Sequence, residues 1–167
     1  VRDLKLLHIL DCTTDVTAIK FSPDGEVMAV ASGNFVYLWQ VNGWKPLARL
    51  KGHTGKVNSL DFSPDNLMIA TGADDRTVRL WNASDGTPIN TIKGHTNKVT
   101  QVAFSPGGQI IASTSLDQTV RLWGTDGSQL TSLRGYPAFS VVFSSGGEAF
   151  AVGYSDGAKL YRTSDLS

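Results

Sequence analysis

The sequence predicts an all-β fold built from four copies of one unit, in which each unit is a sheet of four antiparallel strands. The first observation is a long-range repetition, since "DDRTVRLW" at residues 74–81 returns as "LDQTVRLW" at residues 116–123. The second is that short segments between the repeated turns alternate apolar and polar residues, a pattern typical of strands. A repeat period of about 42 residues indicates an array of similar structural units, so it decides the architecture before local propensity is considered.

The repeated unit covers nearly the whole chain. A turn phrase related to "FSPDG" stands at residues 21–25, 62–66, 104–108 and 143–147. A strand phrase that contains "LW", changed to "LY" in the last copy, stands at residues 38–40, 80–82, 122–124 and 160–162. We therefore expect a single domain over residues 1–167, with repeats at about 11–50, 52–92, 94–134 and 135–167.

The second repeat shows how one unit is made. Its four expected strands lie within residues 56–64, 66–72, 76–82 and 87–94. The phrases "SPDN", "GADD" and "SDG" place Pro, Asp, Asn and Gly at the joints, where the backbone must reverse. Such a sheet is apolar on both faces and cannot cover both alone. Radial stacking of the sheets, as in a β-propeller, would bury these faces and protect the strand edges.

The order of these motifs resembles the WD-repeat family of β-propellers. The second and third repeats carry Gly-His, then Phe-Ser-Pro, then Ala-Thr or Ala-Ser, then an Asp followed by Thr-Val-Arg-Leu-Trp. The resemblance covers residues from about 4 to 162 and is complete only in these two repeats, since the outer two are eroded. It implies four-stranded antiparallel blades, with four blades' worth of strands in one chain.

A hydroxyl, an imidazole and a carboxylate recur in the two middle repeats and invite comparison with a hydrolase. Because the same set recurs one repeat later, each time with a Trp, a structural network in each blade explains it better than one catalytic site. The resemblance implies a buried hydrogen-bonded tetrad in each of these repeats. The tetrad residues are His53, Thr71, Asp75 and Trp81, then His95, Ser113, Asp117 and Trp123.

The outer repeats depart from the tetrad pattern. The first keeps Trp39, but Cys12 and Val30 stand at the His and hydroxyl positions. In the last repeat, Val152 stands at the hydroxyl position and Tyr161 at the Trp position. We expect these two blades to depend on apolar packing.

Residues 4–10 precede the first complete repeat and match the outer, fourth strand of a blade by position. The last repeat lacks this strand, so residues 4–10 can supply the outer strand of a closing blade. Three arrangements are compatible with this pattern. Two chains can form an eight-bladed ring, the chain can be part of a longer array, or it can close alone on four blades. We favour the two-chain ring, in which each chain is half of an eight-bladed propeller and exposed sheet edges are removed.

Composition excludes several classes of function. Fifteen basic residues balance fifteen acidic ones, and no basic stripe suited to nucleic acid is present. The single cysteine rules out an intramolecular disulfide, no Cys/His cluster suggests a metal, and no motif suggests a cofactor. No segment is long and apolar enough to predict a membrane span. An intracellular, cytoplasmic location fits this composition.

The resemblance also implies a partner-binding face beside the tetrads. The residues at those positions are Lys56, Asn58, Asp74, Lys98, Thr100, Leu116 and Phe139. The exposed aromatic ring of Phe139 beside two lysines could anchor a protein or peptide that carries an acidic group. The sequence therefore predicts a non-enzymatic protein-interaction scaffold completed by self-association into a homodimer. The alternatives are part of a longer WD-repeat sensor or regulatory protein and, less well supported, an enzyme with its site in the central channel.

Overall fold

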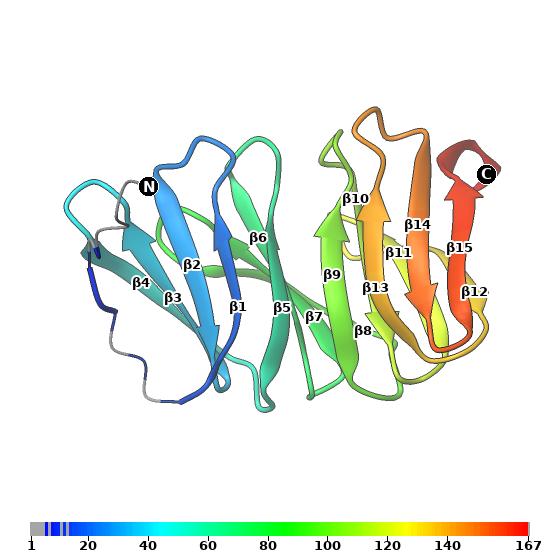
Figure 1. Cartoon of the computed structure of the whole chain (residues 1–167), viewed down its shortest axis with the longest axis horizontal. Coiled ribbons are helices and arrows are strands. Elements are labelled where there is room, and N and C mark those ends of the chain that lie inside the picture. The colour runs from blue at the N-terminus through cyan, green and yellow to red at the C-terminus, as the bar shows by residue number, and fades with distance from the viewer. Residues whose placement is uncertain (1–5, 7, 11, 13, 167) are drawn as a thin grey trace, which may run out of the picture.

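The computed structural model of the chain describes residues 6, 8–10, 12 and 14–166, and these form fifteen strands and one short 3-10 helix (Figure 1). The first sheet contains β1 (Val16–Phe21), β2 (Val27–Ser32), β3 (Phe35–Gln40) and β4 (Lys45–Lys51). The second contains β5 (Val57–Phe62), β6 (Met68–Ala73), β7 (Thr77–Asn82) and β8 (Pro88–Lys93). The third contains β9 (Val99–Phe104), β10 (Ile110–Ser115), β11 (Thr119–Gly124) and β12 (Gln129–Arg134). The fourth contains β13 (Ala138–Phe143), β14 (Ala149–Tyr154) and β15 (Gly157–Arg162), followed by the helix Thr163–Leu166.

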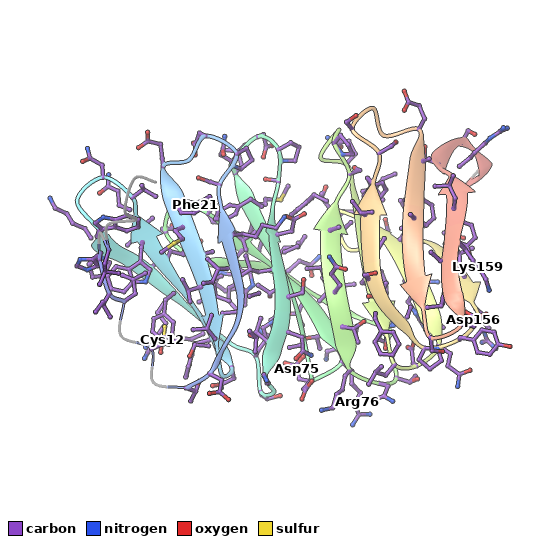
Figure 2. All side chains as sticks on the ribbon, in the orientation of Figure 1. Cys12, Phe21, Asp75, Arg76, Asp156 and Lys159 are labelled. Carbon is purple, nitrogen blue, oxygen red and sulfur yellow. The ribbon has the colours of Figure 1, made fainter. Side chains whose placement is uncertain are left out.

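The four antiparallel sheets confirm the predicted all-β fold and its division into four blades' worth of strands. Each sheet packs against the next, with the first strands β1, β5, β9 and β13 as successive neighbours. The first and fourth sheets lie at opposite ends of the row (Figure 1). Figure 2 shows the same separation through Phe21 on the first sheet and Lys159 on the fourth. One chain is therefore an open array, and it does not adopt the four-bladed closure considered above.

A β-bulge explains an irregularity in the apolar pattern of the second repeat. Pairing between β5 and β6 shifts register between Val57 and Ser59. An extra residue in one strand changes which face the later residues occupy. Val57, Leu60 and Phe62 therefore reach one apolar cluster although their spacing is not strictly two.

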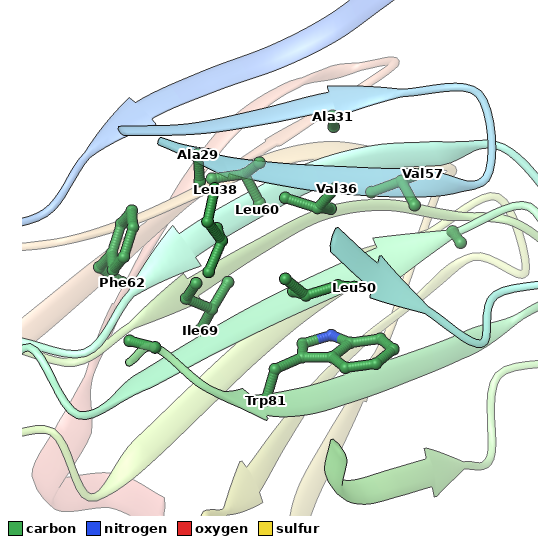
Figure 3. Packing of buried hydrophobic residues seen from close by; sticks show 12 residues of the cluster. Ala29, Ala31, Val36, Leu38, Leu50, Val57, Leu60, Phe62, Ile69 and Trp81 are labelled. Atoms are coloured by element: carbon green, nitrogen blue, oxygen red, sulfur yellow. The ribbon is translucent and has the colours of Figure 1, made fainter. Parts of the chain in front are cut away.

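Apolar clusters fill the spaces between neighbouring sheets. Between the first two sheets, Leu38 and Leu50 pack with Ile69 and Trp81 (Figure 3). On β7, Leu80 instead joins the cluster shared with the third sheet. Both faces of the second sheet are consequently buried, as the stacking argument requires, and this apolar burial is the main stabilising contribution.

The two ends of the array lack this cover. Leu38, Leu80 and Leu122 occupy equivalent positions on the third strands and are buried, whereas Leu160 of β15 is 76% exposed. At the other end, Phe21 of β1 is 52% exposed, whereas Phe62 and Phe104 are buried. Each end therefore presents an apolar face of the kind that is covered between consecutive sheets.

The expected outer strand at residues 4–10 lies only partly within the described residues. Leu6 and His8–Leu10 are described and form no strand in the single chain, and residues 4, 5 and 7 lie outside the described part. Pairing of this segment with a fourth sheet stays a prediction for the assembled ring. Separately, no helix within the described residues is long and apolar enough to cross a membrane.

Candidate functional site

The second repeat brings its four predicted tetrad residues into one hydrogen-bonded chain. The indole Nε1 of Trp81 donates to Thr71 Oγ1 at 2.8 Å, and that hydroxyl lies 2.7 Å from His53 Nε2. The other ring nitrogen, His53 Nδ1, lies 2.8 Å from Asp75 Oδ2. An ionised carboxylate only accepts, so Nδ1 carries the imidazole proton and Nε2 accepts the hydroxyl proton of Thr71.

The third repeat has the same arrangement. Trp123 Nε1 donates to Ser113 Oγ at 2.8 Å, and His95 Nε2 lies 2.7 Å from that hydroxyl. His95 Nδ1 lies 2.8 Å from Asp117 Oδ2, which also accepts the backbone N–H of Thr96. The network thus joins the segment before β9 to the turn between β10 and β11.

Electrostatics favours a neutral imidazole beside an ionised carboxylate. Burial lowers the pKa of His53 and of His95, and this outweighs the attraction of the neighbouring Asp. Burial of Asp117 opposes its ionisation, but hydrogen bonds from Thr119, the Thr96 N–H and His95 lower its pKa to about 2. Thr71 and Ser113 are fully buried, so a substrate could not reach their hydroxyl oxygens without unfolding the sheet. The geometry is that of a structural link between strands.

The last repeat contains a polar pair that the sequence interpretation missed. Tyr154 OH lies 3.1 Å from Tyr161 OH, and the Tyr161 ring stacks on Phe150. Burial raises the pKa of Tyr154. The expectation that this blade has apolar packing alone is therefore incomplete. Tyr at the Trp position was visible in the sequence, but its hydroxyl partner comes from the end of β14.

The first repeat differs again, at the residue that keeps the Trp of the motif. The Nε1 atom of Trp39 is buried and has no hydrogen-bond partner among the described residues. In the middle repeats the equivalent nitrogen donates to Thr71 or Ser113, but Val30 stands at that position here. Val30 cannot accept a hydrogen bond, which explains the unpaired indole.

The seven predicted partner-face residues come together around one shallow depression of about 440 Å³, which we call the rim depression. They are contributed by the second, third and fourth sheets and the turns beside them. Its lining residues are Lys56, Asn58, Asp74, Lys98, Thr100, Leu116 and Phe139.

Contacts within and between sheets order the floor of the rim depression. Lys98 Nζ lies 2.7 Å from Asp74 Oδ2, and Asn58 Nδ2 donates to Asp74 Oδ1 at 2.8 Å. Thr100 Oγ1 donates to the carbonyl of Ala138 at 2.7 Å. Burial opposes ionisation of Asp74, but the bonds from Asn58 and Lys98 lower its pKa overall. Repeat spacing alone did not reveal that Lys98 and Asp74, from different repeats, would pair.

The charge and shape of the rim depression suit a mixed ligand. Lys56 and Lys98 supply two positive charges against the single negative charge of Asp74. Phe139 is 51% exposed beside them and offers an aromatic surface. The arrangement can bind a group that carries both a negative charge and an apolar side chain.

Comparison with known proteins identifies the family. The family model described as "WD domain, G-beta repeat" matches residues 4–40, 44–82 and 86–124. The chain belongs to the WD-repeat family. Domains of this family are typically protein-interaction scaffolds and generally non-catalytic. The last WD repeat, which is eroded in sequence, lies outside the three matches but still forms the three-stranded fourth sheet.

Several curated WD-repeat relatives resemble part of the chain. Pre-mRNA-processing factor 19 homolog 2 of Arabidopsis thaliana is 37% identical over 62 residues, or 36% of this chain and 12% of that protein. Ribosome assembly protein 4 of Chaetomium thermophilum is 46% identical over 57 residues, or 32% of this chain and 11% of that protein. The U5 small nuclear ribonucleoprotein 40 kDa protein of Homo sapiens is 37% identical over 57 residues, or 34% of this chain and 16% of that protein. The matches thus cover less than a fifth of these relatives' lengths.

Proposed function

We propose that the chain is a non-enzymatic scaffold that binds a protein or peptide at the rim depression, without a cofactor, metal or nucleic acid. The observation that carries this proposal is the convergence of seven residues from three sheets on one surface depression. Phe139 provides an aromatic anchor, and Lys56 and Lys98 attract an acidic group. Aromatic anchors surrounded by polar rims are typical of protein interfaces.

The relatives support an intracellular role in assembling other macromolecules. Their names refer to pre-mRNA processing, ribosome assembly and a small nuclear ribonucleoprotein. We extend to this chain only the general role of a scaffold inside the cell, with the cytoplasm as its proposed location. The single cysteine agrees with a reducing compartment.

Selection from a phage-displayed random peptide library tests the rim depression directly. We expect enriched peptides to combine an acidic residue with an apolar one, and the Lys56→Glu/Lys98→Glu variant to bind them at least about tenfold more weakly, since each tenfold corresponds to about 1.4 kcal/mol. The control is Lys45→Glu/Lys51→Glu, which makes the same charge change at exposed positions of β4. Failure to enrich peptides, or equal weakening by both variants, would count against this site.

We also propose that a second copy completes the propeller as an eight-bladed homodimer. The exposed faces that contain Leu160 and Phe21 are the counterparts of faces buried between consecutive sheets. The far edge of β15 lies where β4, β8 and β12 pair in the other sheets, and the fourth sheet has no such strand. Edges of this kind are templates for another chain.

The position of residues 8–10 supports this mode of closure. Within the array, Ala48 and Leu50 of the outer strand β4 lie against Gly86 in the turn after β7. The His8 ring stacks on Trp44, in the corresponding turn after β3, with ring centroids 6.1 Å apart. His8 thus lies beside the first sheet where the outer strand of a preceding blade belongs. The first family match, which begins at residue 4, agrees with this assignment.

Light scattering on a sizing column tests the homodimer. One chain weighs 17.9 kDa, and we expect a sharp species of twice that mass. A monomer or a polydisperse sample would contradict the two-chain ring and would favour the alternative, that the missing blades belong to a longer WD-repeat sensor or regulatory protein.

A further inference from the structure

The first residue of each first strand is a small apolar side chain that faces the preceding sheet. Val57, Val99 and Ala138 are all fully buried, whereas Val16 on β1 is 44% exposed. Val57 joins the cluster between the first two sheets, and Val99 joins the cluster between the second and third. Among these four residues, Val16 alone has no preceding sheet within the described part of the chain.

A glycine makes room for this side chain at the junction between the second and third sheets. A Cβ atom placed on Gly72 of β6 would lie 2.5 Å from Val99 Cγ1 and 3.2 Å from Val99 Cβ. No real Cβ fits at that distance, so Val99 occupies space that exists because residue 72 has no side chain.

The other junctions pair residues of different size at the same place. Ala31 accompanies Val57 in the first cluster. At the junction between the third and fourth sheets, Thr100 Oγ1 hydrogen-bonds both Thr114 Oγ1 and the carbonyl of Ala138. The larger Thr114 is thus associated with the smaller Ala138. At the preceding junction, Gly72 has no side chain and is associated with the larger Val99. Complementary volumes of this kind keep an interior close-packed.

The fourth sheet carries the same glycine notch, with no sheet beside it. Gly153 of β14 is paired with Ser140 in the register in which Gly72 is paired with Ser59. Gly153 and Gly72 are therefore equivalent positions. In the single chain Ser140 Oγ lies against the place where a Cβ on Gly153 would be, whereas the equivalent Ser59 Oγ accepts the N–H of Val102 from the next sheet. One end of the array therefore has a glycine with no neighbouring sheet against it, and the other end has an exposed valine of the size that packs against Gly72.

We infer that Val16 of a second copy of this chain occupies the notch at Gly153, which sets the register in which two copies join. This inference rests on the proposed homodimer and specifies its geometry. The fourth sheet of one copy then packs against the first sheet of the other copy in the same way as the second sheet packs against the third within one chain. By symmetry the same contact forms twice in an eight-bladed ring.

Packing at this junction matters more than at the internal ones because a hydrogen bond is missing. Thr17 Oγ1 donates to the carbonyl of Val57 at 2.6 Å, and Asn58 Nδ2 donates to that of Val99 at 2.9 Å. Thr100 makes the equivalent bond to Ala138, as described above. Phe139 holds this position in the fourth sheet and cannot donate. The junction between copies therefore depends on the fit of apolar side chains.

An engineered disulfide tests the register. The pair Val16→Cys with Gly153→Cys, in a Cys12→Ser background, places two thiols at the positions equivalent to Val99 and Gly72. A Cβ placed on Gly72 would lie 3.2 Å from Val99 Cβ, slightly below the 3.5–4.5 Å range typical of disulfides. Ser140→Ala is added because Ser140 Oγ would otherwise contact the new Cβ at position 153. Under mild oxidation we expect a covalent dimer on a non-reducing gel.

The matched control is Val16→Cys with Leu160→Cys in the same background. It keeps one thiol on the exposed face of the first sheet and moves the other from β14 to β15 on the exposed face of the fourth sheet. We expect cross-linking at least about tenfold slower, because disulfide geometry is specific. A dimer by light scattering in which the first pair fails to cross-link, or cross-links no faster than the control, would overturn the register and leave the proposed homodimer standing. A monomer by light scattering would overturn both.

Discussion

His53 Nδ1 lies 2.8 Å from Asp75 Oδ2, a residue 22 positions further along the chain. This contact joins the segment before β5 to the turn between β6 and β7, and the same carboxylate oxygen accepts the Thr54 N–H. Because the His53 side chain is buried, its bonds are not exchanged for water, and their loss removes one hydrogen-bond partner from Asp75 and one from Thr71.

Replacement of His53 should therefore destabilise the chain more than replacement of an outlying histidine. We expect His53→Ala to lower the free energy of unfolding by about 2–4 kcal/mol, since a cavity is created and two hydrogen bonds of a buried network are lost. His8→Ala is the control, because His8 is exposed and its ring stacks on the Trp44 ring. Equal shifts of melting temperature for the two variants would contradict a stabilising role for the tetrad.

Stability should fall as the solution is acidified, first through the two buried histidines. Burial holds the pKa of His53 and His95 below the ordinary value of 6.5. Between the lowered folded-state pKa and 6.5, the unfolded chain therefore binds protons that the folded chain does not. Their contribution is present above pH 6.5 and is lost as pH falls. Below this, Asp117 adds a further loss as pH falls from 3.8 towards its folded pKa of about 2. Urea unfolding from pH 7.5 to 4.5 measures the histidine effect.

The matched variant for this pH prediction is His53→Asn/His95→Asn, which removes both titrating groups. We expect its stability to change less over pH 7.5–4.5 than that of the unmodified chain, even though it starts lower. A parallel decline in both proteins would show that other groups control the acid sensitivity.

The unpaired indole of Trp39 predicts a tolerated polar substitution in the core. Val30→Thr places a hydroxyl where Thr71 accepts from Trp81 in the next repeat, so the new oxygen gains a partner. We expect little or no loss of stability. Val152→Thr is the matched control in the last repeat, where the Tyr161 hydroxyl already bonds Tyr154, and it should cost about 1–3 kcal/mol. Similar losses in chemical denaturation would contradict this assignment.

The exposed Leu160 predicts a substitution that affects assembly without affecting the fold. Leu160→Lys should leave the circular dichroism spectrum and melting of the isolated chain nearly unchanged, because the side chain is 76% exposed there. A buried lysine without a partner would, however, prevent the second copy from docking. We expect a species of 17.9 kDa by light scattering. The control Leu130→Lys, at an exposed position of β12, should remain a dimer, and loss of the dimer in both would point to a non-specific effect.

Much of the fold followed from the sequence because each repeat specifies its own sheet. Turn residues and alternating apolar positions recur, so four sheets and the missing strand of the fourth were predicted correctly. The two tetrads were assigned from the resemblance to the WD-repeat family, and the recurrence of one set of residues at one offset in two repeats favoured a structural role. The pairing of Tyr154 with Tyr161 was missed because it has no counterpart in another repeat.

By itself the sequence determined the strands and the four-unit array, because both depend on the repeat period and on local turn chemistry. The residues that line the rim depression followed from the resemblance to the WD-repeat family. Only the tertiary structure decided which residues meet between sheets. The ion pair of Lys98 with Asp74, the fit of Val99 at Gly72 and the exposure of Val16 and Leu160 all depend on how one sheet stacks on the next. That stacking is set by side-chain volumes across a junction, which the period of a sequence does not encode.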